Sequence, residues 1–348
     1  MIQKSQSEIM KNWQGDPDCP LVSIRCTAYN HEKYIEQCLD GFLMQETTFP
    51  FEAIVHDDAS TDQTAGIIRK YEERYPKIIR PVYETENQYS KQDGSLRRVM
   101  NAYCTGKYMA LCEGDDYWTD PEKLQRQISF LEEYPDYSMI FHAVDYVIDG
   151  KAVSNDRRSA VECDFSTEDI IRGGGDFCAT ASLCLRSGFF LDRYEFQKHA
   201  DVGDYPMQIA MALRGKIHYI PDTMAAYRDS SGNNTSWTAR TLSDKEKRDK
   251  HYKVEISWLT ELDEFTNAKY RDAINYRIAI MSFKLFKDNA LSLKDMKIIM
   301  DKLNDRDRMM IEKEVLRFRV KESIKKGLPF IYIPYKKIKD LTGSERKN

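Results

Sequence analysis

The sequence Met109-Ala-Leu-Cys-Glu-Gly-Asp-Asp-Tyr-Trp-Thr-Asp-Pro121 joins a short apolar run to a cluster of acidic residues. Residues 107–112 have the length and composition of a buried β-strand, and Glu113, Asp115 and Asp116 follow it directly. In open α/β sheets, ligands bind beyond the carboxyl ends of the strands. We therefore expect these acids to lie, exposed, at the edge of a ligand site.

Asp115 and Asp116 permit two interpretations. Adjacent ionised carboxylates repel each other, and a divalent cation relieves that repulsion; their oxygen atoms suit Mg²⁺ or Mn²⁺. The alternative is a solvated turn before a helix, because Thr119-Asp-Pro-Glu122 is typical of a helix start. The residues alone leave both interpretations open.

The chain around this stretch alternates between strand-like and helical patterns. Strands are predicted over 21–27, 51–56, 78–83, 107–112, 138–148, 178–186 and 216–221, and helices over 32–44, 61–75, 95–103, 121–134 and 205–213. Strand, helix and strand in succession predict parallel, right-handed crossovers. The expected fold is a doubly wound α/β domain with a mostly parallel sheet.

The remaining segments have weaker or different patterns. Residues 151–175 are polar and charged, and we predict a mobile connection with a short helix at 167–172; residues 229–237 have the composition of a loop. Beyond residue 241, helical spacing replaces strand-like runs. The predicted organisation is an N-terminal appendage (1–19), an α/β domain (20–238) and a helical C-terminal region (239–348).

Charge and cysteine content narrow the class of protein. The chain has 52 basic and 56 acidic residues, which argues against a nucleic-acid-binding protein, and its 8 cysteines include no C-x-x-C pair, as expected for reduced cytosolic thiols. Residues 3–14 are polar, and no apolar run is long enough to cross a bilayer. We expect a cytoplasmic protein, either free or peripheral on the inner face of the membrane.

The C-terminal tail is basic. From Lys313 to the end there are 11 Lys and Arg residues against 4 Asp and Glu residues, a net charge of +7 in a chain whose total is −4. Such a tail is most often a solvated surface, and the alternative is peripheral contact with an anionic membrane.

Three acidic pairs occur at ends of predicted elements: Asp57 with Asp58, Asp115 with Asp116, and Asp201 with Asp204. In a parallel sheet the first two pairs face the same crevice. Carboxylates and a metal ion in one crevice indicate an enzyme acting on a phosphorylated, hydroxyl-rich substrate. Neither a G-x-G-x-x-G after the first strand nor a G-x-x-x-x-G-K-[ST] occurs, which argues against dinucleotide and P-loop chemistry.

Four motifs resemble, in order and spacing, the signatures of inverting glycosyltransferases of family 2, which have the GT-A fold. They are Val22-Ser-Ile-Arg-Cys-Thr-Ala-Tyr-Asn-His31, His56-Asp-Asp-Ala-Ser-Thr-Asp-Gln-Thr64, Gly106-Lys-Tyr-Met-Ala-Leu-Cys-Glu-Gly-Asp-Asp-Tyr-Trp118 and Gly203-Asp-Tyr-Pro-Met207. The resemblance covers residues 20–236 and implies a GT-A domain with a C-terminal helical extension.

The resemblance also implies a nucleotide site. Asp58 would accept a hydrogen bond from the N–H of a pyrimidine, and uracil is the expected base because a carboxylate only accepts. The other nucleotide-binding residues would be Thr27, Ala28, Tyr29, Arg97, Arg98, Gly114 and Asp115.

The metal and the base follow from the same resemblance. Asp115 and Asp116 would form the D-x-D-like site for Mn²⁺ or Mg²⁺, and Asp204 would be the general base. Similar sequences often have a histidine ligand in a Tyr-Arg-x-His-Ser-Gly loop, where this chain has Ser230, so either Asp229 or water completes the site. The alternative role for Asp204 is to cap the next helix, whose positive end would in either case keep it ionised.

The expected activity is transfer of a sugar from a uridine diphosphate donor to a hydroxyl of a capsule-like surface polysaccharide or its lipid-linked precursor. Two alternatives remain. A metal-dependent sugar-nucleotidyltransferase would need a glycine-rich, basic loop, which residues 27–33 lack. A non-catalytic glycan-binding module would need no general base.

Overall fold

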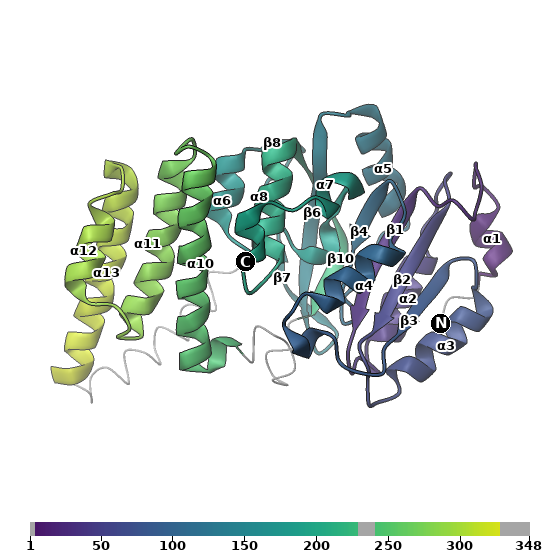
Figure 1. The fold of residues 1–348 in the computed structure, drawn as a ribbon, viewed down its shortest axis with the longest axis horizontal. Helices are drawn as coiled ribbons and strands as arrows, with labels where there is room; N and C mark the ends of the chain where they lie inside the picture. The colour runs from purple at the N-terminus through teal and green to yellow at the C-terminus, as the bar shows by residue number, and fades with distance from the viewer. Residues whose placement is uncertain (1–3, 229–240, 328–348) are drawn as a thin grey trace. The chain divides into compact units, whose positions relative to one another are not determined.

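The computed structural model describes residues 4–228 and 241–327, and the chain divides into two compact units, Met1–Arg240 and Thr241–Asn348 (Figure 1). The first unit holds the sheet and the second is helical. The boundary between them follows the end of the last strand.

The first unit alternates strands and helices. Its strands are β1 (Val22–Ala28), β2 (Phe51–Asp57), β3 (Ile79–Tyr83), β4 (Tyr108–Leu111), β5 (Tyr117–Trp118), β6 (Tyr137–Ile148), β7 (Lys151–Asp156), β8 (Cys163–Phe165), β9 (Cys184–Arg186) and β10 (Lys216–Arg228). Its α-helices are α1 (Gln6–Met10), α2 (Ile35–Leu43), α3 (Thr64–Arg74), α4 (Ser95–Tyr103), α5 (Lys123–Glu133), α6 (Thr167–Gly173), α7 (Ser187–Leu191) and α8 (Asp204–Arg214). Short 3₁₀ helices cover Tyr89–Lys91, Thr180–Ser182 and Glu195–Lys198.

The strands form one mixed sheet in the order β3-β2-β1-β4-β9-β6-β10-β5, with β7 beside β6 and β8 beside β10. The pairs β1–β2, β1–β4, β2–β3 and β6–β10 are parallel, whereas β9 runs antiparallel to β4 and β6. The predicted α/β fold with a mostly parallel sheet is confirmed.

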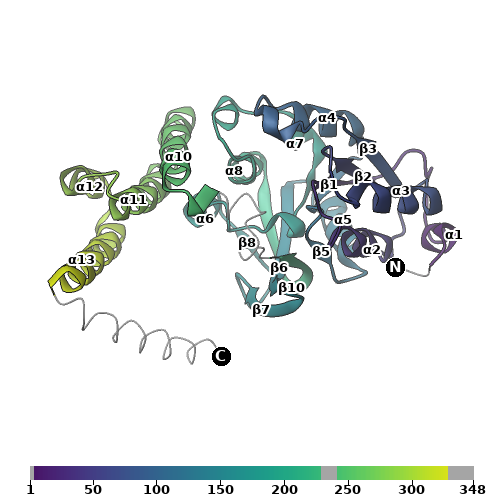
Figure 2. The same cartoon turned by 90° about the horizontal axis from the view of Figure 1, so that it is seen from below.

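The two faces of β1 differ in polarity, because side chains alternate along a strand. Val22, Ile24 and Cys26 are buried in one apolar cluster with Leu39 and Phe42 of α2. Ser23, Arg25 and Thr27 therefore belong to the opposite face. Figure 2 shows α2 and α5 on one side of the sheet and α4 and α7 on the other. The polar side chains of β1 lie on the side of α4 and α7.

The predicted mobile connection over residues 151–175 is wrong in its first part, since β7 and β8 form there. Most residues of β7 are exposed, so no buried face imposes an apolar alternation on its sequence. The predicted helix is present as α6, where Ser166 and Asp169 form a capping box.

Two predicted strands have different bounds in the structure. The strand expected over 178–186 begins only at Cys184, after a 3₁₀ turn. The strand expected over 216–221 continues to Arg228, because β10 stays paired with β6 across irregularities in register after Ile220. Its extension brings Arg228 to the end of β4. The predicted loop over 229–237 lies outside the described residues.

The described part of the N-terminal segment packs on the first unit. Ile9 of α1 is buried in the apolar cluster of the sheet, and Trp13 packs against the same cluster. The Tyr75 hydroxyl donates a hydrogen bond to the carbonyl oxygen of Lys4 at 2.9 Å.

The second unit consists of α10 (Lys245–Phe265), α11 (Arg271–Lys287), α12 (Leu293–Met300) and α13 (Asp305–Gly327). Ala279 of α11, Met296 and Met300 of α12, and Ile311 and Val315 of α13 form one buried cluster. The predicted helical C-terminal region is thus confirmed as far as Gly327. The basic tail, which begins at Lys313, is described only up to Gly327.

No helix in the described ranges has both the length and the apolar character that crossing a membrane requires.

Candidate active site

Gly114 brings the end of β4 against the end of β1. Its N–H donates to the carbonyl oxygen of Thr27 at 2.8 Å. A Cβ at this position would lie 2.9 Å from His31 Nδ1 and 3.0 Å from Ala28 Cβ, closer than real side chains approach. A residue without a side chain is therefore required for this contact. It explains a glycine inside the acidic motif, although the close packing leaves little room for the expected nucleotide contact at Gly114.

Glu113 is a candidate functional residue. Its position after a strand was predicted from the sequence, but no role was assigned to it. Its Oε2 accepts a hydrogen bond from the Thr27 hydroxyl. Burial, together with the charges of Asp204 and Asp115, raises the pKa of Glu113 to about 7 against the opposing effects of Thr27 and Arg25. Because such effects fall with distance, they place these charged groups in one neighbourhood.

Asp204 does not cap its helix. The N-cap of α8 is Gly203, and Asp204 is the first helical residue. Burial raises its pKa, while Arg25 and a hydrogen bond with Thr180 lower it. Burial thus opposes the expected effect of the helix end on Asp204, because desolvation outweighs the partners that lower its pKa. The residue nevertheless keeps a solvent-exposed surface.

Asp115 and Asp116 have different environments. The Asp115 side chain is 24% exposed, and its Oδ2 lies 4.0 Å from His31 Nε2. Asp116 is 2% exposed, and its Oδ1 accepts a hydrogen bond from the Arg228 N–H at 2.8 Å. The expectation that both aspartates are exposed is wrong for Asp116, because the extended β10 covers it. Burial and the charge of Asp115 raise the pKa of Asp116 well above its usual range.

Arg228 connects several parts of this site, and no role for it was expected from the sequence. Its guanidinium donates to the carbonyl oxygen of Asp115 and to the side chain of Gln37. It also lies over the rings of Tyr34 and Tyr117, at 4.9 and 4.5 Å from their centroids. These contacts fix the chain between β4 and β5.

The carboxylates of this site suit a divalent metal ion whose remaining ligands are substrate oxygens. Within residues 4–228 and 241–327, no three His, Cys, Asp or Glu side chains are grouped to hold a metal by themselves. Mg²⁺ in particular often takes only one or two carboxylates together with substrate phosphates. Asp115 and Glu113 provide carboxylates of this kind. The expected ligand Asp229 lies outside the described residues.

The expected base pocket is only partly accessible. Tyr29 is exposed just beyond β1, whereas Ala28 is buried and its carbonyl oxygen accepts from the Asp58 N–H at 2.9 Å. Asp58 is 3% exposed, and its two oxygens accept from the N–H groups of Gln88 (2.6 Å) and Tyr89 (3.0 Å). Asp58 therefore anchors the segment before α4, a role that the sequence did not indicate.

Arg97 and Arg98 differ in their contacts. Arg98 donates to the carbonyl oxygen of Asp93 at 2.7 Å and to Ser95 Oγ at 2.8 Å. Arg97 forms no hydrogen bond or ion pair with the residues that the structure describes. Burial, Arg98 and Arg25 lower its pKa. Of the two arginines, Arg97 is therefore the one that lies near Arg25, and no described residue accepts a hydrogen bond from its guanidinium.

Comparison with solved structures identifies the fold. The TarS fragment 1–349 of S. aureus, solved in complex with UDP-GlcNAc, matches with a TM-score of 0.57 at 18% identity over 82% of each chain. The first unit, with its parallel strands and acidic strand end, is a GT-A fold.

The chain belongs to glycosyltransferase family 2. The family model described as "Glycosyl transferase family 2" matches residues 23–194, which include the second and third motifs and nearly all of the first; the fourth motif, at 203–207, lies beyond the matched range. An uncharacterized protein of Mycobacterium tuberculosis (strain ATCC 25618 / H37Rv) is 37% identical over 208 residues, covering 60% of this chain and 58% of the relative. The chain thus spans a little over half the length of this mycobacterial relative.

A second relative has a named activity. WfaP of Escherichia coli, described as a UDP-Glc:alpha-D-GlcNAc-diphosphoundecaprenol beta-1,3-glucosyltransferase, is 34% identical over 133 residues, which are 37% of this chain and 50% of WfaP.

Proposed function

We propose that this chain transfers a sugar from a nucleotide-diphosphate donor to an acceptor hydroxyl, with inversion at the anomeric carbon. One observation carries the proposal: Asp204, at the start of α8, stands close enough to the acidic end of β4 to raise the pKa of Glu113. A candidate base and candidate donor-binding carboxylates thus share one site although they are far apart in the sequence.

Asp204 is the proposed general base. Its raised pKa makes it a stronger proton acceptor, and its exposed surface gives an acceptor hydroxyl access. It takes the hydroxyl proton while the oxygen attacks the anomeric carbon. The bond to the donor diphosphate breaks on the opposite face, and a single displacement of this kind inverts the configuration.

The remaining residues hold the donor. A Mg²⁺ or Mn²⁺ ion at Asp115, with Glu113 beside it, would neutralise charge on the departing diphosphate. Arg97 offers unused donors to a phosphate. Asp116, bound to the backbone of Arg228, holds the strand end in place, so its contacts support a positioning role better than the expected metal ligation.

The proposed donor is a uridine diphosphate sugar. The activity named for WfaP uses such a donor. The expected contact of Asp58 with the N3–H of uracil adds no support, because both oxygens of this buried side chain already accept from the backbone of Gln88 and Tyr89. The proposed acceptor is a surface polysaccharide or a lipid-linked precursor, again by similarity to WfaP. All eight cysteines are free thiols, which fits the cytoplasmic location predicted from the sequence.

A screen of nucleotide sugars tests this function. Donor hydrolysis is measured with Mn²⁺ present and again with EDTA, and calorimetry compares UDP, CDP and ADP. We expect hydrolysis of a UDP-sugar that EDTA abolishes. Pyrophosphate formation from a sugar phosphate and UTP would indicate a nucleotidyltransferase instead. Glycan binding without turnover of any donor would indicate a binding module.

A further inference from the structure

Helix α13 has apolar residues on two opposite faces. Ile311 and Val315 are buried against α11 and α12. On the other face, four apolar side chains remain exposed: Met309 (65%), Leu316 (60%), Val320 (49%) and Ile324 (43%). Steps of seven, four and four residues place them in one stripe along a helix. We call these four residues the outer stripe.

Basic side chains lie within the outer stripe, at Lys313, and beside it. Between Lys313 and Gly327 the helix has six Lys and Arg residues and two Glu residues. Lys313, Arg319 and Lys321 are exposed and form no hydrogen bond or ion pair with any described residue. The stripe therefore combines exposed apolar area with positive charge that the described protein leaves unneutralised.

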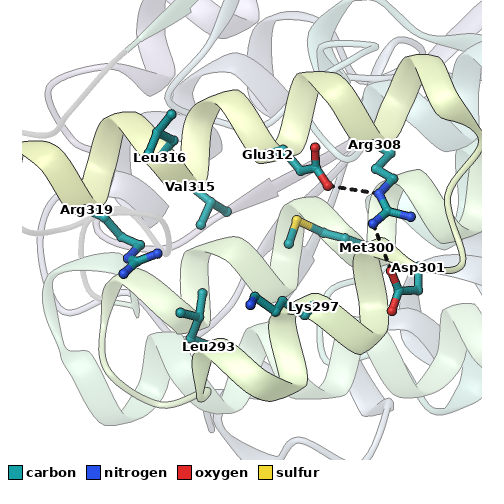
Figure 3. Close-up of a pocket in the computed structure, with 9 residues that line it drawn as sticks. All are labelled: Leu293, Lys297, Met300, Asp301, Arg308, Glu312, Val315, Leu316 and Arg319. Atoms are coloured by element: carbon teal, nitrogen blue, oxygen red, sulfur yellow. Dashed lines mark hydrogen bonds and ion pairs between the residues drawn. The ribbon is translucent and has the colours of Figure 1, made fainter.

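A groove between α12 and α13 adjoins the stripe at Leu316 (Figure 3). Its apolar lining consists of Leu293, Met300, Val315 and Leu316. At one end, Arg308 is neutralised by Asp301 at 3.1 Å and Glu312 at 2.9 Å.

The opposite end of the groove is positive. Figure 3 shows Lys297 and Arg319 extending toward the same part of the groove, near Leu293. Lys297, like Arg319, has no hydrogen-bonding or ion-pair partner in the described part of the chain. Two cations beside an apolar floor suit a group that is anionic at one end and apolar at the other.

The pattern fits a second copy of the helix poorly. A coiled-coil seam requires apolar residues at alternating steps of four and three. Counted from Met309, that seam would include Lys313, Ser323 and Gly327. Apolar residues on one face with Lys and Arg around them are instead typical of helices that lie in the interface of an anionic membrane.

We propose that the outer stripe and the adjoining groove dock the second unit on an anionic lipid bilayer. The apolar side chains of the stripe enter the interface between head groups and acyl chains. Lys297 and Arg319 bind the phosphate of a head group, and its acyl chain continues over Leu293 and Leu316. This surface includes the described part of the basic tail, from Lys313 onward, and the proposal does not depend on the glycosyltransferase activity.

Sedimentation of the full chain with lipid vesicles tests the proposal. Vesicles of phosphatidylcholine are compared with vesicles that also contain phosphatidylglycerol, at low and high salt. We expect sedimentation with the anionic vesicles, release by high salt, and little binding to neutral ones. Leu316→Ser/Val320→Ser should weaken the partition coefficient roughly tenfold or more, because two apolar side chains no longer enter the interface.

Charge is tested separately. Lys297→Gln/Arg319→Gln should lose roughly tenfold or more of the binding to anionic vesicles, since each basic residue contributes near the surface. The matched controls are Lys70→Gln/Lys151→Gln for charge and Val153→Ser/Val161→Ser for exposed apolar area, both in the first unit. The controls should sediment like the unchanged chain, and thermal melting should show that all variants fold.

Three results would overturn the proposal. One is equal binding to neutral and anionic vesicles. Another is sedimentation of Leu316→Ser/Val320→Ser at the level of the unchanged chain. The third is a dimer in ultracentrifugation that this variant dissociates, which would assign the stripe to a second copy.

Discussion

The carboxyl ends of β2 and β4 each carry two adjacent aspartates, and the structure uses them differently. At β2, Asp57 and Asp58 are both buried, and Asp58 binds the backbone of Gln88 and Tyr89. At β4, Asp116 is buried and bound to Arg228, whereas Asp115 stays partly exposed beside Glu113. The charge of Asp204 also acts on Glu113 at the end of β4.

The difference shows that a pair of acids at a strand end does not by itself make a site. A buried carboxylate that accepts backbone N–H groups stabilises a loop, while an accessible one next to other carboxyls can bind a cation or move a proton. What separates the two ends is the segment that covers them: residues 87–89 at β2, and β10 at β4.

Asp58→Ala should give the largest loss of stability. It removes two hydrogen bonds to a charged group, each worth about 1.5–3 kcal/mol, so the free energy of unfolding should fall by about 3–6 kcal/mol. Urea denaturation measures this, and Asp58→Asn, which keeps one acceptor oxygen, should lose less. If Asp58→Ala unfolds like the unchanged chain and only UDP affinity falls, the end of β2 is a nucleotide site and the comparison fails.

Asp115→Asn should act on turnover instead. Losing a charged ligand for a metal that stabilises the leaving diphosphate should lower kcat on the order of 10²-fold, or about 2.7 kcal/mol. Because Asp115 is partly exposed, the free energy of unfolding should change by less than about 0.5 kcal/mol. Steady-state kinetics with Mn²⁺ and a denaturation curve measure both quantities. Full activity of this variant would remove Asp115 from the metal site.

Asp116→Ala should destabilise the fold by about 1–3 kcal/mol, because the N–H of Arg228 loses its acceptor. Asp116→Asn keeps an oxygen at that position and should retain most of the stability. The exposed metal site expected from the sequence would imply the opposite for the alanine variant, an intact fold with weaker UDP binding. Thermal and urea unfolding of the two variants, run side by side, decide between these expectations.

Arg25→Met should change the pH dependence. Arg25 lowers the pKa of Asp204, so its removal raises that pKa. A general base must be deprotonated, so the acidic limb of the kcat profile should move to higher pH. Arg25→Lys keeps the charge and should restore the limb. Superimposable profiles for Arg25→Met and the unchanged chain would show that Arg25 does not act on the base.

The sequence predicted most of the fold because the buried strands impose their pattern on it. Residues of β2 are all buried and include the apolar run 53–55, and α2 places its apolar residues at helical spacing. β7 was not predicted because its residues are mostly exposed, so its sequence has no apolar pattern.

The residues that make up the site could largely be predicted from the sequence, but the role of each residue could be predicted less well. The acidic residues at strand ends were visible, but the partner of Asp116 comes 112 residues later, from a strand whose length was underestimated. A charged residue in the middle of the predicted strand at 21–27 was the available signal for Arg25. Nothing local distinguished Asp58 from Asp115, because the segments that cover them are set by tertiary packing.

The most direct test of the account compares Asp204→Asn with Asp201→Asn in a transfer assay. Asparagine cannot accept the acceptor proton, so Asp204→Asn should lose roughly 10² to 10⁴ in kcat while its melting temperature and UDP affinity stay unchanged. Asp201→Asn, an exposed neighbour before the same helix, should remain near normal. Near-normal transfer by Asp204→Asn, together with a collapse in Asp201→Asn, would contradict the assignment of the base.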